Sequence, residues 1–190
     1  MTRAQICCFT GHRPDKLPWG EHEQDPRCVR IKAELAAALE RAYALGYRHF
    51  ISGMARGGDL YFAEAVLALR EKYPDVLLEC ARPCESQSDR WPRDERQRYD
   101  DILDRCNLET MVQHTYDRWC MMRRNRYMVD HSAHIIALYD GVPTGGTAQT
   151  LNPATFEAIY ANHAFMGDSG GVPTVTPAED WDLMCLELGE

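Results

Sequence analysis

The sequence predicts an α/β protein of the Rossmann-like class, a three-layer sandwich around a mostly parallel sheet. Short apolar runs alternate along the chain with longer segments whose apolar residues recur every three or four positions. That alternation is typical of strands followed by amphipathic helices. Turns rich in glycine or charged residues follow several of the runs. Strands that alternate with helices imply parallel pairing, with helices on both faces of the sheet.

Composition narrows the class of protein. The chain has 190 residues, enough for one domain with a core, and a formal net charge of −8, which disfavours nucleic acid as a partner. No apolar stretch reaches the roughly 20 residues of a membrane span, and no signal peptide is visible. The eight cysteines lack Cys-x-x-Cys spacing, and His131 and His134 lack further spaced ligands. We expect a reduced cytoplasmic protein without a metal site or a membrane partner.

The first strand and helix are expected within the first 46 residues. Gln5–Phe9 is a short apolar run and an expected strand. Asp25 and Pro26 predict a helix start, because aspartate caps helices and proline suits the first helical position. Gly46 then ends the helix as a left-handed cap.

A second strand–helix–strand unit follows. Tyr47–Ile51 is an expected strand, and Asp59 is expected to cap the helix after it. Pro74 ends that helix, because proline cannot continue it. Val76–Cys80 is largely apolar, as parallel strands covered on both faces are.

The middle of the chain is heavily charged. We expect a loop and then a surface helix over residues 92–105, beginning near Pro92. Asn107–Gln113 is the fourth expected strand. Thr115 or Asp117 could cap the next helix, which would run through Asp130.

The fifth expected strand, His134–Tyr139, leads into a glycine turn. Gly145–Thr147 places bare backbone N–H groups at a strand-to-helix junction. The start of a helix favours an anion, typically a phosphate. The alternative is a tight turn in which Thr147 only caps the helix.

The carboxyl ends of parallel strands meet at one edge of a sheet, where ligands bind. The turns after the expected strands should therefore converge there. The expected ligand-binding residues are Thr10, Gly11, His12, Arg13, Ser52, Gly53, Arg56, Gly57, Gly58, Asp59, Arg82, Arg124, Gly145, Gly146 and Thr147.

Side-chain chemistry suggests a division among these residues. Arg56 and Arg82 can make bidentate contacts to phosphate. Asp59 is unfavourable beside a phosphate, so it is expected to be a helix cap or to accept from a ribose hydroxyl. Glu64 is the best candidate for a general base, if the protein is an enzyme.

Four motifs occur in a characteristic order: CFTGHRP at Cys8–Pro14, SGMARGGD at Ser52–Asp59, RN and MVD within Arg124–Asp130, and YDG with GGT within Tyr139–Thr147. Together they resemble the YpsA family of the SLOG superfamily of Rossmann-like proteins, over about residues 5–150. That superfamily also includes LOG-type phosphoribohydrolases and the DNA-processing protein DprA. The resemblance implies a nucleotide or nucleotide-derived ligand, such as NAD or ADP-ribose. It also favours Arg124 over Arg123 as the residue that faces the site.

The sequence departs from the LOG-type pattern after the glycine turn. LOG-type enzymes carry a catalytic glutamate in the helix after Pro-Gly-Gly-x-Gly-Thr. Here Ala148–Thr150 follow instead, and no acid occurs before Glu157. This argues against phosphoribohydrolase activity. Pro153 would interrupt the helix, so the resemblance ends near Leu151.

The chain is expected to divide into a domain of residues 1–166 and a tail of residues 167–190. Gly167–Pro173 has the composition of a flexible linker, and Thr176–Glu179 is a capping-box pattern. Apolar residues at helical spacing follow, namely Trp181, Met184, Cys185 and Leu188. They predict a short helix packed on its own domain. Alternatively it docks on a neighbouring subunit, and we expect a homo-oligomer.

Three functions stay open at this point. The first is a sensor or binding module for a nucleotide derivative. The second is a hydrolase of an N-glycosidic or phosphoribosyl bond, which would need a positioned acid. The third is a DprA-like binder of single-stranded DNA, against which the acidic balance argues.

Overall fold

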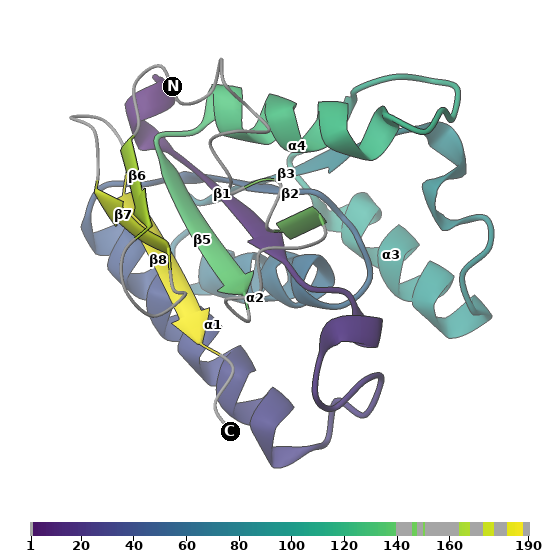
Figure 1. The fold of residues 1–190 in the computed structure, drawn as a ribbon, viewed down its shortest axis with the longest axis horizontal. Helices are drawn as coiled ribbons and strands as arrows, with labels where there is room; N and C mark the ends of the chain where they lie inside the picture. Colours follow the sequence, from purple (N-terminus) through teal and green to yellow (C-terminus); the bar gives the residue numbers. More distant parts are fainter. Residues whose placement is uncertain are drawn as a thin grey trace.

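The computed structural model describes residues 2–139, 146–147 and 150, and the backbone of strands at 164–167, 173–176 and 182–187. Six strands form one sheet in the order β4-β3-β2-β1-β5-β8, and every neighbouring pair is parallel (Figure 1). The strands are β1 (Ile6–Gly11), β2 (His49–Ser52), β3 (Leu77–Arg82), β4 (Leu108–Met111), β5 (His134–Tyr139) and β8 (Asp182–Glu187). Separately, β6 (Ala164–Gly167) and β7 (Pro173–Thr176) pair antiparallel. The Rossmann-like α/β class is confirmed.

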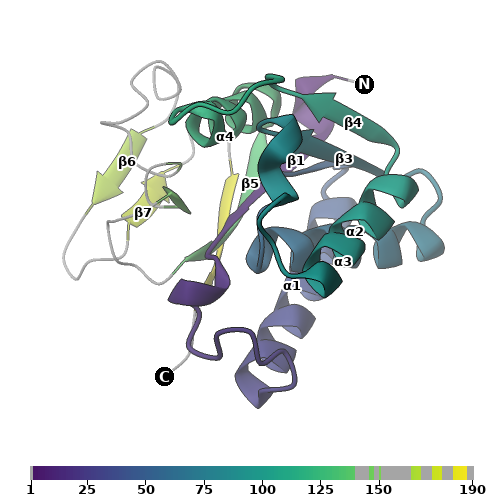
Figure 2. The ribbon, with the colours of Figure 1, turned by 90° about the vertical axis from the view of Figure 1, so that its right-hand side faces the viewer.

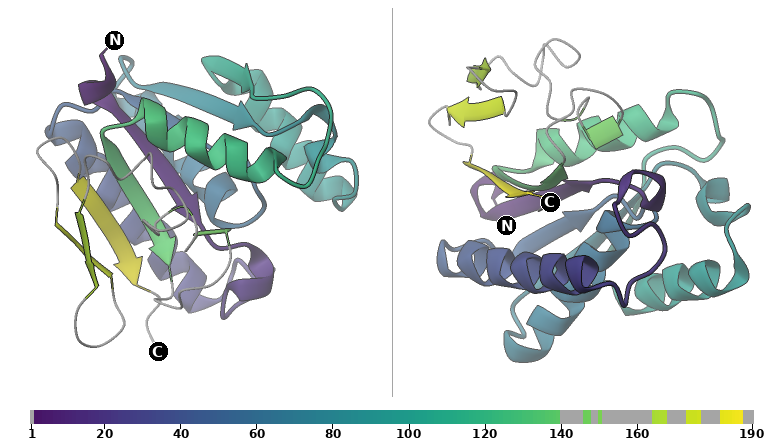
Figure 3. Two further views of the ribbon diagram at one scale, coloured as in Figure 1. Left: turned by 45° about the horizontal axis from the view of Figure 1, so that its top comes forward. Right: turned by 60° about the horizontal axis from the view of Figure 1, so that its bottom comes forward.

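Helices cover both faces of the sheet (Figures 2 and 3). The main helices are α1 (Pro26–Ala44), α2 (Gly58–Lys72), α3 (Arg93–Arg105) and α4 (Cys120–His131), and three short 3-10 helices are η1 (Arg3–Gln5), η2 (Pro14–Lys16) and η3 (Glu85–Ser88). One apolar core joins α1, α2 and α3 to inward residues such as Phe9 and Leu78. A second apolar core joins α4 to strand residues that point to the other face of the sheet, such as Cys8 and Ala81. Successive strand residues thus serve opposite cores.

The strand order reverses between β1 and β5. The chain runs from β1 through β2 and β3 to β4 on one side, then returns to place β5 on the other side of β1. In the β1–β5 register, Thr10 lies opposite Ala137 and Gly11 opposite Leu138. Ligands of open α/β sheets bind at such a switch point, beyond the carboxyl ends of the strands.

Local patterns predicted these elements well. All five expected strands are present, within two residues at each end. The Asp25 side chain caps α1 by accepting from the Arg27 amide at 2.9 Å. Gly46 ends that helix with φ of +100°. Its amide donates to Tyr43 and the next amide to Ala42, which is the Schellman pattern.

Two expected helix caps are wrong. Asp59 is not the cap of α2, because Gly57, with φ of +80°, occupies that position and α2 begins at Gly58. Neither Thr115 nor Asp117 caps α4, which begins at Cys120. Asp117 instead accepts from the Trp119 amide at 2.8 Å, one turn before the helix.

The expected tail helix is also wrong. Residues 182–187 form β8, which pairs with all six residues of β5. All residues of β5 are buried, so leaving its outer edge unpaired would leave backbone N–H and C=O groups of a buried strand without partners. The ends of the expected linker, Gly167 and Pro173, belong to β6 and β7. Residues 168–172, Trp181 and Leu188 lie outside the described residues.

Candidate functional site

The start of α2 packs directly against the end of β1. The Gly58 amide donates to the His12 carbonyl at 3.1 Å. A Cβ on Gly11 would lie 2.6 Å from Phe9 Cε1 and 3.3 Å from the Gly58 Cα. A Cβ on Gly57 would lie 2.9 Å from the His12 carbonyl oxygen. These three glycines are required by close backbone packing, and one amide at the start of α2 already has a protein partner.

The turn between β2 and α2 is held from inside the protein. Ser52 is fully buried; its hydroxyl donates to the Asp59 carbonyl at 2.9 Å and accepts from the Met54 amide at 3.2 Å. The Gln87 amide donates to the carbonyls of Gly53 at 3.2 Å and Met54 at 2.9 Å. Ser52 and Gly53 therefore shape the turn, and neither lines the cavities described below. Sequence reasoning missed Gln87, whose contacts span more than 30 residues of chain.

Behind this turn, α4 contributes a buried arginine. Arg124 Nη1 lies 3.3 Å from Asp59 Oδ2 and donates to the Gly53 carbonyl. Burial raises the pKa of Asp59 despite the nearby charge of Arg124. Burial likewise lowers the pKa of Arg124 despite Asp59, and Arg13 lowers it further. For both partners, desolvation outweighs the mutual attraction.

A cavity of about 310 Å³ lies at the switch point, beyond the end of β1 and beside α4. Both Asp59 and Arg124 line it. Among the expected ligand-binding residues it also brings together Thr10, Gly11, His12, Arg13, Gly146 and Thr147. The expected convergence of the first-strand turn with the Gly-Gly-Thr turn is present in the structure. Gly145 lies outside the described residues.

The Gly-Gly-Thr turn is tied to α4. Gly146, Thr147 and Thr150 are helical. The Thr150 hydroxyl donates to the Gly146 carbonyl and accepts from the Asn125 side chain, both at 2.8 Å. Gly146 is exposed, and no described atom lies within 4 Å of the position of its Cβ. Its backbone is therefore open to a ligand, whereas Gly11 and Gly58 are closed against each other.

Positive charge predominates among the described residues that line this cavity. Its cations are Arg13, Lys16 and Arg124, and its carboxylates are Asp15 and Asp59. Among the described residues, Arg13 has no ion-pair partner. Its charge lowers the pKa of Arg124, so an anion placed between the two guanidinium groups would relieve their repulsion.

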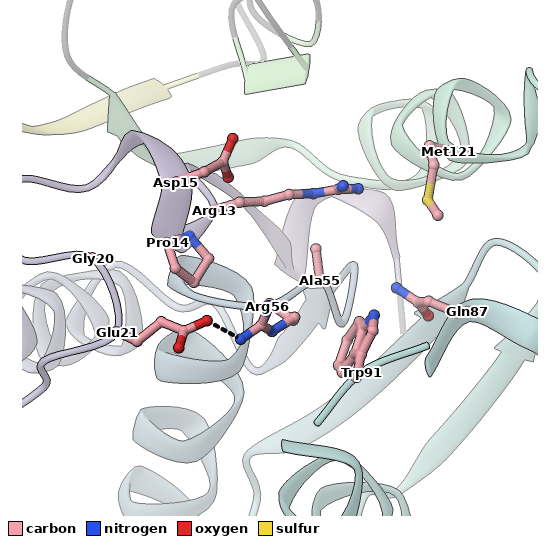
Figure 4. A pocket seen from close by; sticks show the side chains of 10 residues that line it. All are labelled: Arg13, Pro14, Asp15, Gly20, Glu21, Ala55, Arg56, Gln87, Trp91 and Met121. Atoms are coloured by element: carbon pink, nitrogen blue, oxygen red, sulfur yellow. Dashed lines mark hydrogen bonds and ion pairs between the residues drawn. The ribbon is translucent and has the colours of Figure 1, made fainter. Parts of the chain in front are cut away.

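A second cavity of about 610 Å³ adjoins the first (Figure 4). Arg13 and Met121 line both cavities. Trp91 and Gln87 line only the second. Arg56 also lies there, but it pairs with Glu21 at 2.5 Å. Its charge is therefore already balanced.

Two expected site residues lie elsewhere. Arg82 pairs with Glu109 at 2.5 Å and does not line either cavity. Glu64 makes two contacts with Arg98, at 2.6 and 2.7 Å, and lines neither cavity. Neither side chain is positioned for the ligand contact or proton transfer expected of it.

A buried carboxylate on the α4 face also escaped the sequence analysis. Glu79 of β3 lies 2.7 Å from His49 and accepts from Thr110 and Tyr127, each at 2.7 Å. Burial is the largest single contribution and acts to raise the pKa of Glu79. The three partners together outweigh burial, so the net effect is a pKa below the ordinary value. A charged residue inside an apolar run is the pattern that could have indicated this cluster.

The family model described as the YspA SLOG family matches residues 7–161. This range includes the turn at Gly57 and Gly58, the turn at Gly146 and Thr147, and the described residues that line the switch-point cavity. The chain belongs to the YpsA family of SLOG proteins. A UPF0398 protein of Bacillus pumilus is 29% identical, covering 79% of this chain and 81% of the relative. The SPbeta prophage-derived protein YoqJ of Bacillus subtilis is also 29% identical, covering 76% and 87%. YpsA of Bacillus subtilis is 26% identical, covering 79% and 84%.

Among solved structures, this YpsA-family chain resembles DNA processing protein A from Helicobacter pylori. The TM-score is 0.51 at 14% identity, over 83% of this chain and 62% of that protein. That work describes a single-stranded DNA binding mode of the Helicobacter protein. At this identity the likeness concerns the fold alone. None of the described helices is long and apolar enough to span a membrane.

Proposed function

We propose that this YpsA-family protein is a binding module, or sensor, for a nucleotide or nucleotide-derived ligand of the NAD or ADP-ribose kind. The ligand's phosphate occupies the switch-point cavity. The observation that carries the proposal is the pair of guanidinium groups, Arg13 and Arg124, in the same cavity as the open backbone of Gly146. Helix-start amides and arginine side chains are the groups that proteins commonly use to hold phosphate.

The two arginines would do different things. Arg124 is buried and fixed by Asp59 and the Gly53 carbonyl, so it supplies a rigid positive wall. Arg13 has no ion-pair partner among the described residues, so it can turn its guanidinium onto the phosphate. Gly146 and Thr147 would add backbone N–H groups, and the Thr147 hydroxyl a further hydrogen bond.

Binding is favoured over hydrolysis because, of the two carboxylates among the described lining residues, Asp15 is exposed to solvent and Asp59 already has protein partners. Asp59 is engaged by Arg124 and by the Ala55 amide at 3.2 Å. Glu64, the earlier candidate, is held by Arg98 outside the cavity. Hydrolysis of an N-glycosidic bond needs a group free to move a proton within reach of the bond.

Isothermal titration with ADP-ribose, NAD and AMP tests the proposal. At least one should bind to the wild-type protein, and Arg13→Met should weaken binding about tenfold or more, since a hydrogen bond to a charged group contributes roughly 1.5–3 kcal/mol. Arg30→Met is the matched control, because Arg30 pairs with Glu34 on α1 and does not line the cavities. Failure of all three ligands to bind, or equal binding to Arg13→Met, would refute the proposal.

A further inference from the structure

The second cavity carries an aromatic wall that the proposed phosphate site does not use. Trp91 lines this cavity (Figure 4). Its ring packs edge-on against Tyr99, with centroids 5.2 Å apart and an interplanar angle of 77°. Tyr99 is itself buried and donates to the Gln87 side chain at 3.1 Å. Gln87 is in turn bound to the Gly53 and Met54 carbonyls. The indole is therefore backed by a rigid set of contacts anchored on the β2–α2 turn.

We infer that the two cavities form one continuous ligand groove, in which Trp91 stacks on the base of a nucleotide whose phosphate lies at the switch point. This inference rests on the proposed function and extends it to the part of the ligand that carries specificity. It places a phosphate and an aromatic ring at opposite ends of one ligand. Each cavity has a volume in the range of small-molecule sites, which is roughly 300–1,000 Å³.

The two cavities differ in the balance of charge among their described lining residues, as a ligand with an anionic end and an uncharged ring requires. Among the described lining residues of the smaller cavity, three cations (Arg13, Lys16 and Arg124) outnumber two carboxylates (Asp15 and Asp59). In the larger one, Arg13 and Arg56 face Asp15 and Glu21, so the charges balance. An anion is favoured in the first, and an uncharged ring with polar edges is favoured in the second. Carboxylates there can accept from amino groups on a base.

Apolar contacts and continuity support the same orientation. Ala55 and Met121 line both cavities, so apolar surface continues from the phosphate end to Trp91. In Figure 4 the Arg13 side chain extends toward Met121, across the space above Trp91 and Gln87. Its guanidinium thus lies where the two cavities join, where it could contact the phosphate or sugar between base and switch point. Aromatic side chains that stack on bases give affinity with little dependence on base identity.

The test compares AMP with ribose 5-phosphate, which lacks the base, by isothermal titration of the full chain. Wild-type protein should bind AMP at least about fivefold more tightly, as one base–aromatic stack provides. Trp91→Leu should lower AMP affinity to that of ribose 5-phosphate and leave the sugar phosphate unaffected. Trp91→Phe should keep the preference for AMP. Trp119→Leu is the control, because Trp119 is 46% exposed and does not line either cavity.

The outcomes separate this inference from the function on which it rests. If AMP and ribose 5-phosphate bind equally, or Trp91→Leu leaves the advantage of AMP intact, the base site is refuted and the phosphate site stands. If Trp91→Leu abolishes binding of both probes, Trp91 supports the fold and the base site is again refuted. If neither probe binds to wild-type protein, the proposed function fails and this inference with it. Binding of oligo-dT without binding of AMP would replace both with a nucleic-acid site.

Discussion

The Asp59 carboxylate lies 3.3 Å from the Arg124 guanidinium, and both side chains are buried beside the switch-point cavity. The pair joins the start of α2 to α4, on opposite faces of the sheet. Burial pushes the pKa of each partner toward its neutral form, so the pair is retained at an energetic cost. A costly ion pair at the edge of a cavity is more readily understood as part of a binding site than as a source of stability.

Arg124→Met should destabilise the protein strongly. The substitution leaves the buried Asp59 carboxylate without its counter-charge, which typically costs about 3–5 kcal/mol. Urea unfolding measures the free energy of unfolding. Arg126→Met on the same helix is the matched control, because Arg126 is exposed and its one ion-pair partner among the described residues is Asp130, so the change should stay within about 0.5 kcal/mol. Equal stability of the two variants would contradict the importance assigned to the buried pair.

Gly53→Ala should destabilise the protein through the same pair. A Cβ at this position would overlap the Arg124 guanidinium and lie 2.8 Å from Asp59 Oδ2. Overpacking of this kind costs about 1–3 kcal/mol. Gly146→Ala is the control, because no described atom lies within 4 Å of its Cβ position. A melting temperature of Gly53→Ala equal to that of Gly146→Ala would show that the turn relaxes freely.

Local patterns in the sequence predicted the strands and the caps of α1, because each depends on residues close along the chain. Asp59 was misassigned because an acid near a helix start resembles a cap, while its main partner lies 65 residues away. The tail was misread for a similar reason. The apolar residues of 182–187 fit a helix by spacing, but pairing with β5 decides their conformation.

The residues that line the two cavities show the same limit of sequence reasoning. Thr10, Gly11 and Gly146 were expected together because parallel strands bring their carboxyl ends to one edge. Trp91 and Gln87 follow no strand directly, and their place in the second cavity depends on contacts with Tyr99 and the Gly53 turn. Such long-range contacts have no periodic trace in the sequence.

Stability at acid pH should depend on Glu79. Its pKa in the folded protein lies below its ordinary value of 4.5, because the hydrogen bonds from His49, Tyr127 and Thr110 outweigh burial. The stabilisation is therefore fully present above pH 4.5 and is lost as the pH falls through the folded pKa. Glu79→Gln should lower stability at pH 7 and flatten the fall of unfolding free energy between neutral and acid pH. Urea titrations across this range check it, with Glu34→Gln as the matched control, because the Glu34 side chain is 43% exposed and lies on the helix surface. An unaltered slope in Glu79→Gln would contradict the prediction.

The protein should release no free adenine from AMP or ADP-ribose. Glu64 is held by Arg98 outside the cavity and Asp59 by Arg124, while Asp15, the other described carboxylate of the cavity, is exposed to solvent, so none is a buried group placed for acid–base catalysis. Chromatography of the incubated nucleotides measures the free base. Glu64→Gln should leave ligand affinity unchanged and lower stability by at most about 1 kcal/mol, because its ion pair is partly exposed. Rapid adenine release that Glu64→Gln abolishes would show that Glu64 is catalytic.

Substitutions in the Gly57 and Gly58 turn should affect the stability of the fold, whereas substitutions in the Gly146 turn should affect ligand binding. The Gly57 and Gly58 turn packs against His12 and Gly11, so its backbone is already occupied. The backbone at Gly146 faces open space in the cavity. Gly146→Val should therefore keep the melting temperature within a few degrees and abolish nucleotide binding, because its side chain fills the phosphate position.

Thr147→Val is the finer test of that turn. Thr147 is buried and lines the cavity, and valine keeps its shape while removing the hydroxyl. Losing one hydrogen bond to a charged phosphate should weaken binding about tenfold or more, since such a bond contributes roughly 1.5–3 kcal/mol. Gly57→Val should do the reverse and unfold the protein, because its Cβ would lie 2.9 Å from the His12 carbonyl oxygen at a positive φ. Titration calorimetry and thermal melts on all three variants measure both properties. A stable Gly57→Val protein that no longer binds nucleotide, beside a Gly146→Val protein that binds normally, would assign the phosphate to the other turn.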